Sequence, residues 1–128
     1  KAIKRLQVRT LHSVRSKVSG LSGGQRQAIA IARAVGTESS VVMLDEPTAA
    51  LGVAQTKQVL EVVKRLRDTN HAVVYISHNM QDIFEVSDRI TVLRHGQNVS
   101  TFITSNTTPD EVVVAMTRGL DKNSVGSV

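Results

Sequence analysis

The stretch VVMLDEP, residues 41–47, places four apolar residues directly before two carboxylates and a proline. A short continuous apolar run of this kind, bounded by polar residues, is typical of a strand buried on both faces of a sheet. A second such run, Ala72–Ile76, is followed by Ser77 and His78. We therefore expect two buried strands, each followed at once by side chains that can carry chemistry.

A helical pattern precedes each of these strands. The run Gln25–Val35 contains small and apolar residues and no helix breaker, which predicts a helix that packs closely on a neighbour, and Gly36 is a candidate C-cap. Val53–Thr69 has the i, i+3, i+4, i+7 spacing of an amphipathic helix, carried by Val59, Val62, Val63 and Leu66. Two successive helix-then-strand passages predict a parallel sheet of the α/β class.

The last third of the chain predicts a hairpin and a further helix. The apolar runs Ile90–Leu93 and Val99–Ile103 are separated by a turn that contains Gly96, which indicates an antiparallel hairpin at the edge of the sheet. Thr108 before Pro109 and two acids is typical of a helix start. A short helix is expected from Met80 onward. The last ten residues, 119–128, are expected to be a frayed tail.

Composition limits the possible classes. A chain of 128 residues with 41% hydrophobic content can bury one modest core. The absence of cysteine excludes a disulfide framework and a thiolate metal site. No apolar stretch approaches the ~20 residues that a membrane helix needs. The net charge of +5 suits an acidic partner, such as nucleic acid, a nucleotide or a membrane surface, or a solvated basic helix face.

The carboxylates after the first strand are candidates for a metal site. Ligands collect at the carboxyl ends of parallel strands, where Asp45 and Glu46 emerge. Mg²⁺ would offset the cost of burying a carboxylate, and a water between the metal and the second carboxylate would be a nucleophile. His78 is expected at the same edge, where it could donate to phosphate oxygens. The alternatives are an acidic turn before Pro47 and a structural histidine.

The stretch LSGGQRQ, residues 21–27, lies at the start of the first predicted helix. A Gly-Gly pair is costly inside a helix and belongs at its entrance, where amide groups are still unpaired. Ser22 offers a hydroxyl, while Gly23 and Gly24 let a bound group come close to the backbone beside the positive end of the helix dipole. The alternative is a plain serine N-cap with a glycine turn.

Taken in this order, the three stretches resemble motifs of the ATP-binding cassette family of ATPases. LSGGQRQ is similar to the signature motif, VVMLDEP to the metal-binding strand and ISH at 76–78 to the histidine switch of that family. The resemblance covers residues 14–119 or so. It implies part of a P-loop-NTPase-like sheet and part of a helical signature subdomain.

The resemblance implies a role for each site residue, with ATP and Mg²⁺ as the ligands. Asp45 would hold Mg²⁺ through water, Glu46 would polarise the attacking water, and His78 would reach the γ-phosphate. In this family two cassettes sandwich two ATP molecules head to tail. The residues that would touch the γ-phosphate of ATP bound mainly to the opposing subunit are Ser22, Gly23, Gly24 and Gln25.

The same resemblance implies a place in a transporter. Three stretches are most similar to those of ATPases of bacterial monosaccharide importers: PTAALGV (47–53), ISHNM (76–80) and DRITVLRHG (88–96). The expected partners are a second cassette, transmembrane permease subunits and, indirectly, a periplasmic or extracellular sugar-binding protein, with no nucleic acid. The expected location is the cytoplasmic face of the membrane. Other subunits would choose the sugar.

Two departures from the family pattern qualify this interpretation. The P-loop G-x-x-x-x-G-K-[ST] is absent, since no lysine is followed by serine or threonine. We therefore expect residues 1–118 to be the C-terminal part of a nucleotide-binding domain, with a helical signature region at 1–36 and an α/β part at 37–118. We also expect this part of the domain to be inactive by itself. Gly52 also stands where the family usually has an aspartate that links the two sites.

Two other hypotheses remain open from the sequence. A cassette ATPase of nucleic-acid repair or translation would suit the basic charge, although such relatives tend to carry long coiled coils or inserted arms next to these motifs. A truncated, non-enzymatic module would expose part of its core, and poor solubility would follow.

Overall fold

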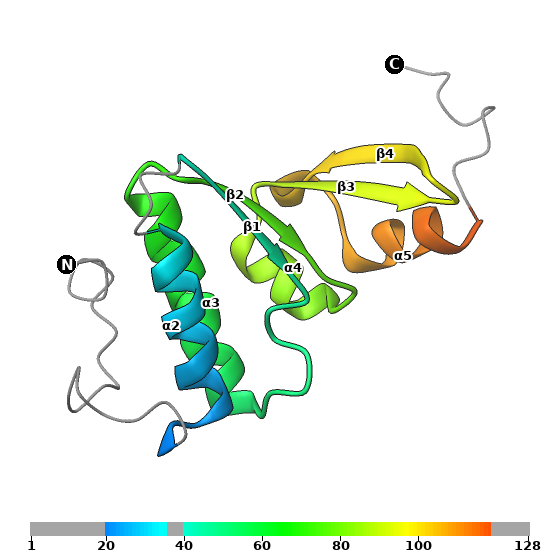
Figure 1. Cartoon of the computed structure of the whole chain (residues 1–128). Helices are drawn as coiled ribbons and strands as arrows, with labels where there is room; N and C mark the ends of the chain where they lie inside the picture. The colour runs from blue at the N-terminus through cyan, green and yellow to red at the C-terminus, as the bar shows by residue number, and fades with distance from the viewer. Residues whose placement is uncertain (1–19, 36–39, 119–128) are drawn as a thin grey trace. The chain divides into compact units, whose positions relative to one another are not determined.

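The computed structural model describes residues 20–35 and 40–118, which divide between two compact units, residues 1–82 and 83–128. We describe each unit by itself. The first contains helix α2 (Gly23–Val35), strand β1 (Val41–Asp45), helix α3 (Val53–Asp68) and strand β2 (Ala72–Ile76), and it ends within helix α4 (Met80–Val86) (Figure 1). This alternation is the one that the sequence predicts.

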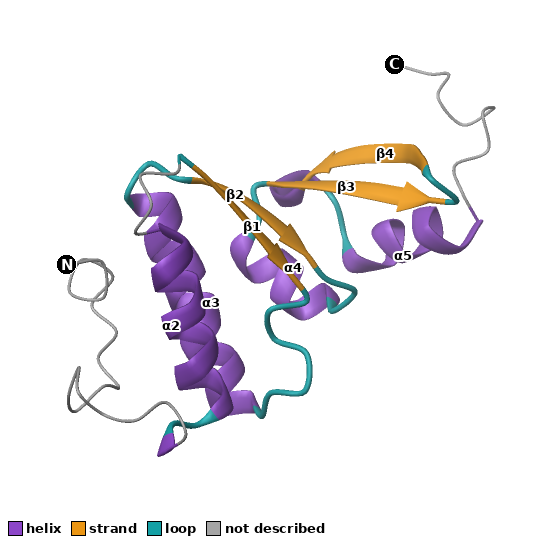
Figure 2. Ribbon diagram, in the orientation of Figure 1, coloured by secondary structure: helices purple, strands orange, loops and turns teal. Residues whose placement is uncertain are grey.

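Strands β1 and β2 form a parallel two-stranded sheet (Figure 2). The register pairs Val41 with Ala72 and Asp45 with Ile76, so the two strands begin and end at the same level. The amide of Glu46 donates to the carbonyl of Ile76 at 2.8 Å, which extends the pairing one residue beyond β1. Parallel strands need a crossover connection, and α3 supplies it.

The described elements of the first unit cover only one face of this sheet. Val42 and Leu44 are buried, and α2 contacts β1 while α3 contacts β2. On the other face Met43 is 69% exposed, and the remaining large exposed apolar residues there are Val41, Val74 and Ile76. The expectation of a strand buried on both faces is therefore wrong within the described part of the first unit, because none of that unit's described elements packs on the Met43 face.

The core of the first unit lies largely between α2 and α3, which run side by side (Figure 1). The fully or nearly fully buried side chains of the two helices are Ala28, Ile31, Ala32, Val59, Leu60, Val62, Val63 and Leu66. A Cβ added to Gly24 would lie 2.8 Å from Cβ of Gln55 and 3.2 Å from its carbonyl oxygen. Only glycine therefore allows the first turn of α2 to approach α3 this closely.

The helix bounds follow the predictions closely. Helix α2 begins two residues before the predicted Gln25, because Ser22 caps it and both glycines enter the first turn. Helix α3 ends at Asp68 with Thr69 as its C-cap, one residue short of the prediction. The predicted C-cap Gly36 and the predicted tail 119–128 lie outside the described residues.

The second unit is an antiparallel hairpin covered by a helix. It contains the end of α4, strands β3 (Arg89–Arg94) and β4 (Gln97–Ile103), the 3₁₀ turn η2 (Thr104–Asn106) and helix α5 (Pro109–Arg118). Helix α5 contacts both strands, and the buried residues of this contact are Ile90, Val92, Val112 and Ala115.

The hairpin turn and the start of α5 form where the sequence predicts them. His95 and Gly96 both have positive φ, +49° and +75°, as a two-residue hairpin turn requires. Thr108 and Glu111 cap α5 reciprocally, at 2.9 and 3.4 Å. The hairpin forms a sheet of its own, so the expected edge position in the parallel sheet is not seen among the described strands.

Replacement of Gly24 by alanine tests the close helix approach. The added methyl group would overlap Gln55, which costs about 1–3 kcal/mol, more than the ~1 kcal/mol that alanine gains over glycine in helix propensity. We expect a lower free energy of unfolding in urea titrations. Gly20→Ala is the control, because a Cβ there meets nothing within 4 Å. Equal stability of the two variants would contradict the packing.

Replacement of Met43 by lysine tests whether the uncovered face of the sheet causes the chain to self-associate. We expect the 128-residue chain to self-associate through this apolar face, and Met43→Lys to reduce that association, since a charge would have to be buried in the contact. Sedimentation velocity over a range of concentrations measures it. Gln81→Lys, at an exposed position of α4, is the control. A monomeric parent chain with a sharp cooperative melt would contradict the expectation.

Candidate functional site

Two of the predicted site residues lie in contact at the carboxyl edge of the parallel sheet. His78 Nδ1 lies 2.7 Å from Glu46 Oε1, and Ser77 Oγ lies 3.5 Å from Glu46 Oε2. An ionised carboxylate can only accept hydrogen bonds, so Nδ1 of His78 is the donor of the shorter one. The contact follows from the strand register, because both residues come directly after strands that end at the same level.

A left-handed turn directs Glu46 toward β2. Its φ is +44°, a conformation that costs a residue with a Cβ roughly 1–2 kcal/mol. Two backbone hydrogen bonds hold it there: the Glu46 amide donates to Ile76, and the Ala49 amide donates to the Glu46 carbonyl at 3.1 Å. Strain of this kind, held by surrounding bonds, is frequent at functional sites.

The segment that carries His78 is held on both sides. The amide of Asn79 donates to Ser77 Oγ at 3.1 Å. The side-chain oxygen of Asn79 in turn accepts hydrogen bonds from the amides of Gln81 and Asp82, at 3.0 and 3.3 Å, and so caps α4. The imidazole therefore projects from a short segment with fixed ends.

The Glu46–His78 pair is open to solvent. The exposed fraction of the side chain is 80% for His78 and 35% for Glu46. An exposed pair of this kind contributes little to stability. Its geometry therefore suits a ligand better than it suits a role in the core, and among the described residues Nε2 of His78 has no hydrogen-bond partner.

Asp45 lies beside this pair in sequence but on the exposed side of β1. The described residues contain no group of three or more histidine, cysteine or carboxylate side chains that could hold a metal ion. Mg²⁺, however, is usually bound by one or two carboxylates together with substrate phosphates and water. The adjacent carboxylates of Asp45 and Glu46 thus fit Mg²⁺ that arrives with a phosphate ligand, and they do not fit a protein-only metal centre.

The remaining predicted site residues form the first turn of α2. The Ser22 amide donates to Gln25 Oε1 at 2.9 Å, and the Gln25 amide donates to Ser22 Oγ at 3.3 Å, which is a reciprocal capping box. Gly23 and Gly24 are the first two helical residues, and Gly24 is buried against Gln55. The serine-cap interpretation thus applies to Ser22. The structure brings this turn against α3, not against the Glu46–His78 pair.

A buried hydrogen-bond network in the first unit is missing from the sequence predictions. Thr48 Oγ1 lies 2.6 Å from Asp82 Oδ2 and 3.3 Å from the Tyr75 hydroxyl. Partial burial raises the pKa of Tyr75, and the negative charges of Asp82 and Glu46 raise it further. No sequence pattern indicates this network, since each residue is unremarkable in its own segment.

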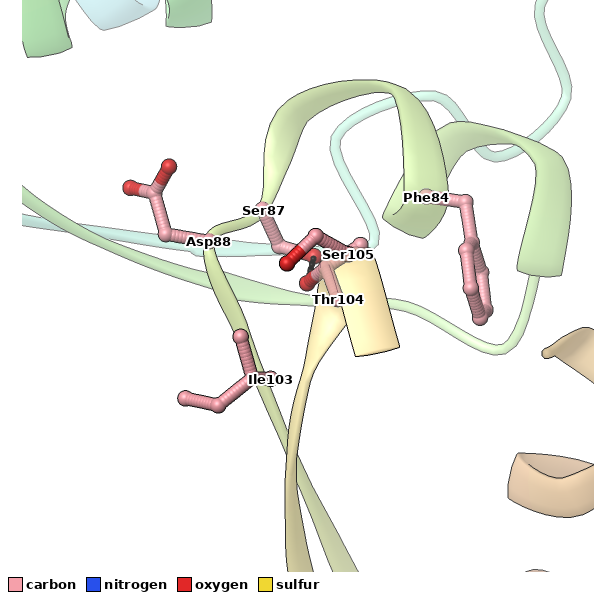
Figure 3. Close-up of a pocket in the computed structure, with 6 residues that line it drawn as sticks. All are labelled: Phe84, Ser87, Asp88, Ile103, Thr104 and Ser105. Carbon is pink, nitrogen blue, oxygen red and sulfur yellow. Dashed lines mark hydrogen bonds between the residues drawn. The ribbon is translucent and has the colours of Figure 1, made fainter. Parts of the chain in front are cut away.

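The second unit has an open depression of about 510 Å³ lined by residues of α4, of the segment between α4 and β3, of β4 and of η2 (Figure 3). The lining residues are Phe84, Ser87, Asp88, Ile103, Thr104 and Ser105. Ser87 Oγ is already 2.7 Å from the Ile83 carbonyl and 3.3 Å from Thr104 Oγ1. None of the predicted site residues lies there, and we assign it no role.

Comparison with known proteins decides the family. Residues 1–49 match the family described as ABC transporter. The fructose import ATP-binding protein of Rhizobium meliloti is 42% identical over 115 residues, which cover 90% of this chain and 44% of that protein. The chain belongs to the ABC transporter ATPase family. The xylose/arabinose import ATP-binding protein of Sulfolobus acidocaldarius is 40% identical, over 91% of this chain and 46% of that protein.

Solved structures of ABC ATPases share the fold. An inward-facing ABC transporter described as of the metal-chelate type matches with a TM-score of 0.76 and 30% identity, over 90% of this chain and 47% of that chain. A dimeric ATP-binding cassette in a post-hydrolysis state, bound to ADP and Pi, matches with a TM-score of 0.63 and 26% identity, over 80% of this chain and 45% of that chain. The α/β fold class is thereby confirmed.

This ABC ATPase chain spans less than half the length of the relatives it matches. The ribose import ATP-binding protein of Yersinia pestis is a further relative, 42% identical over 77% of this chain and 20% of that protein. In the described ranges of the ABC ATPase chain, no helix combines the length and the apolar character that crossing a bilayer requires.

Titration of Tyr75 tests the buried network. It is the only tyrosine of the chain, so tyrosinate absorbance reports on it alone. We expect its midpoint to lie above the usual value of about 10 in the folded chain and to return to about 10 in concentrated urea. A raised folded pKa gives stability that is present below about pH 10 and is lost as pH rises through the folded pKa.

Tyr75→Phe is the control for this titration and should remove that alkaline loss of stability. The same midpoint in the folded and the unfolded chain would contradict the burial of the hydroxyl in the network.

Proposed function

We propose that this chain is the C-terminal half of the nucleotide-binding domain of an ABC importer, and that the whole protein hydrolyses ATP to drive uptake of a monosaccharide. The observation that carries the proposal is the 2.7 Å contact between Glu46 and His78 at the carboxyl edge of a parallel sheet, in a chain of the ABC ATPase family. Three relatives named as import ATP-binding proteins for sugars support the direction and the substrate class.

Glu46 is the proposed activating group of the reaction. Its carboxylate accepts a hydrogen bond from the attacking water, whose oxygen forms a bond to the γ-phosphorus as the bond between that phosphorus and the leaving ADP oxygen breaks. The proton that is released leaves with inorganic phosphate. The hydrogen bond from His78 Nδ1 orients the Glu46 carboxylate.

His78 and Asp45 complete the proposed site. Because Nδ1 is directed at Glu46, Nε2 is the nitrogen that can donate a hydrogen bond to the γ-phosphate, where negative charge develops in the transition state. Asp45 would hold Mg²⁺ through water. When bound, Mg²⁺ neutralises charge on the phosphate oxygens.

The first turn of α2 is proposed to contact the nucleotide that is bound to a second cassette. A helix start offers unpaired amides and the positive end of the helix dipole, which suit a phosphate group. Ser22, Gly23, Gly24 and Gln25 would supply this contact in a head-to-tail dimer. A dimeric relative of known structure bound to ADP and Pi supports this arrangement.

The remaining parts of the proposal concern the whole protein. Its P-loop would precede residue 1, and 1–118 would be the C-terminal part of the domain, with residues 119–128 as a tail. Its partners would be transmembrane permease subunits and, through them, a sugar-binding protein, and it would lie on the cytoplasmic face of the membrane. Nothing in the described structure favours a nucleic-acid partner over this one.

Replacement of Glu46 by glutamine tests the proposed chemistry. The variant keeps the size of the side chain and removes the charge that activates water, so we expect ATP turnover by the full-length protein to fall by about 100-fold or more. Steady-state phosphate release measures it. Glu61→Gln is the matched control, because Glu61 is an exposed carboxylate on α3, 3.7 Å from Lys64. Unchanged turnover in the Glu46 variant would refute the assignment.

A further inference from the structure

The proposed chemistry leaves one buried carboxylate unused. Asp82 is only 4% exposed, and its partner Thr48 is 8% exposed. The two are joined by a short hydrogen bond of 2.6 Å between Thr48 Oγ1 and Asp82 Oδ2. These are the buried polar residues of the described chain, and neither lies on the exposed edge where Glu46 and His78 meet.

The direction of the bonds in this network follows from the hydrogens available. A carboxylate can only accept hydrogen bonds, so Thr48 donates its one hydroxyl hydrogen to Asp82. The Tyr75 hydroxyl, 3.3 Å away, is then the donor to Thr48 Oγ1. The chain of bonds therefore runs from Tyr75 through Thr48 to Asp82, and all three groups have their partners within the protein.

Asp82 is tied to both segments that carry the proposed site. Its side chain binds Thr48, which lies two residues after Glu46 in the same turn. Its amide donates to Asn79 Oδ1 at 3.3 Å, and Asn79 directly follows His78. One residue thus connects the turn after β1, which carries Glu46, to the segment after β2, which carries His78.

We propose that Asp82 and Thr48 are positioning residues that hold Glu46 against His78 through their buried hydrogen bond. This inference rests on the proposed function of the Glu46–His78 pair. Water does not reach a buried bond and so does not replace a missing partner, which makes the position of the Glu46 turn sensitive to this single contact. Neither residue touches the nucleotide in the proposed site, so substrate binding does not depend on them.

Removal of the Thr48 hydroxyl tests the inference in the full-length protein. Thr48→Val keeps the shape of the side chain and breaks the bond. Because a displacement of about 1 Å in a catalytic group can cost as much as ~100-fold in rate, we expect kcat for ATP hydrolysis to fall by about 10-fold or more. KM for ATP should stay within about twofold. Thr48→Ser keeps the hydroxyl and should restore most of kcat.

A second variant and a control distinguish a loss of positioning from a loss of folding. Asp82→Asn keeps the shape of the acceptor with a weaker hydrogen bond, so its kcat should lie between that of the parent and that of Thr48→Val. Thr101→Val removes an exposed hydroxyl that is 3.1 Å from Thr91 in the hairpin, and it should leave kcat unchanged. Thermal melts of every variant show whether the protein is folded at the assay temperature.

Combination with Glu46→Gln separates positioning from a general structural effect. If Thr48 acts through Glu46, Thr48→Val should lower the rate much less in the Glu46→Gln background than in the parent. The inference is overturned if folded Thr48→Val retains parental kcat, or if its loss is the same in both backgrounds. Unchanged turnover in Glu46→Gln alone would instead overturn the proposed function, and the inference with it.

Discussion

The parallel pairing of β1 with β2 is the constraint on which the proposed site depends. Its register places the last residues of both strands opposite each other, so whatever follows one strand meets whatever follows the other. The bond from the Glu46 amide to the Ile76 carbonyl continues this pairing by one residue. A shift of one residue would point Glu46 away from His78, since successive side chains of a strand point to opposite faces. The pairing of the two strands therefore brings the Glu46 and His78 side chains together, whether or not a ligand is bound.

A second constraint is the contact between the first turn of α2 and α3. Gly24 lies so close to Gln55 that no side chain fits between them. Gln55 also accepts a hydrogen bond from the Gly52 amide at 3.1 Å, and so caps the start of α3 in the loop that follows Asp45 and Glu46. The glycine-rich start of α2 therefore serves the packing of the protein itself. This packing role and the proposed nucleotide role are compatible, because the packing contact is made at the Cα of Gly24 and the proposed phosphate contact would be made by backbone N–H groups of the first turn.

The sequence predicts the elements well because local patterns encode them. Continuous apolar runs give both parallel strands, the helical periodicity of Val59, Val62, Val63 and Leu66 gives α3, and Thr108 before Pro109 gives the start of α5. Features that depend on distant contacts are not predicted. The exposure of Met43 depends on which elements cover the sheet, and the burial of Asp82 depends on a turn that carries Thr48 to it. A polar residue in a short helix otherwise indicates a solvent-facing side chain, so no local signal points to Asp82.

The central claim is that the Glu46–His78 edge receives the terminal phosphate of ATP. The most direct measurement is a crystal structure of the full-length protein, with Glu46→Gln to slow hydrolysis, bound to ATP and Mg²⁺. We predict that a γ-phosphate oxygen lies within hydrogen-bond distance of His78 Nε2 and that an ordered water lies between that phosphate and residue 46. A nucleotide whose terminal phosphate is bound away from this edge of the sheet would contradict the account.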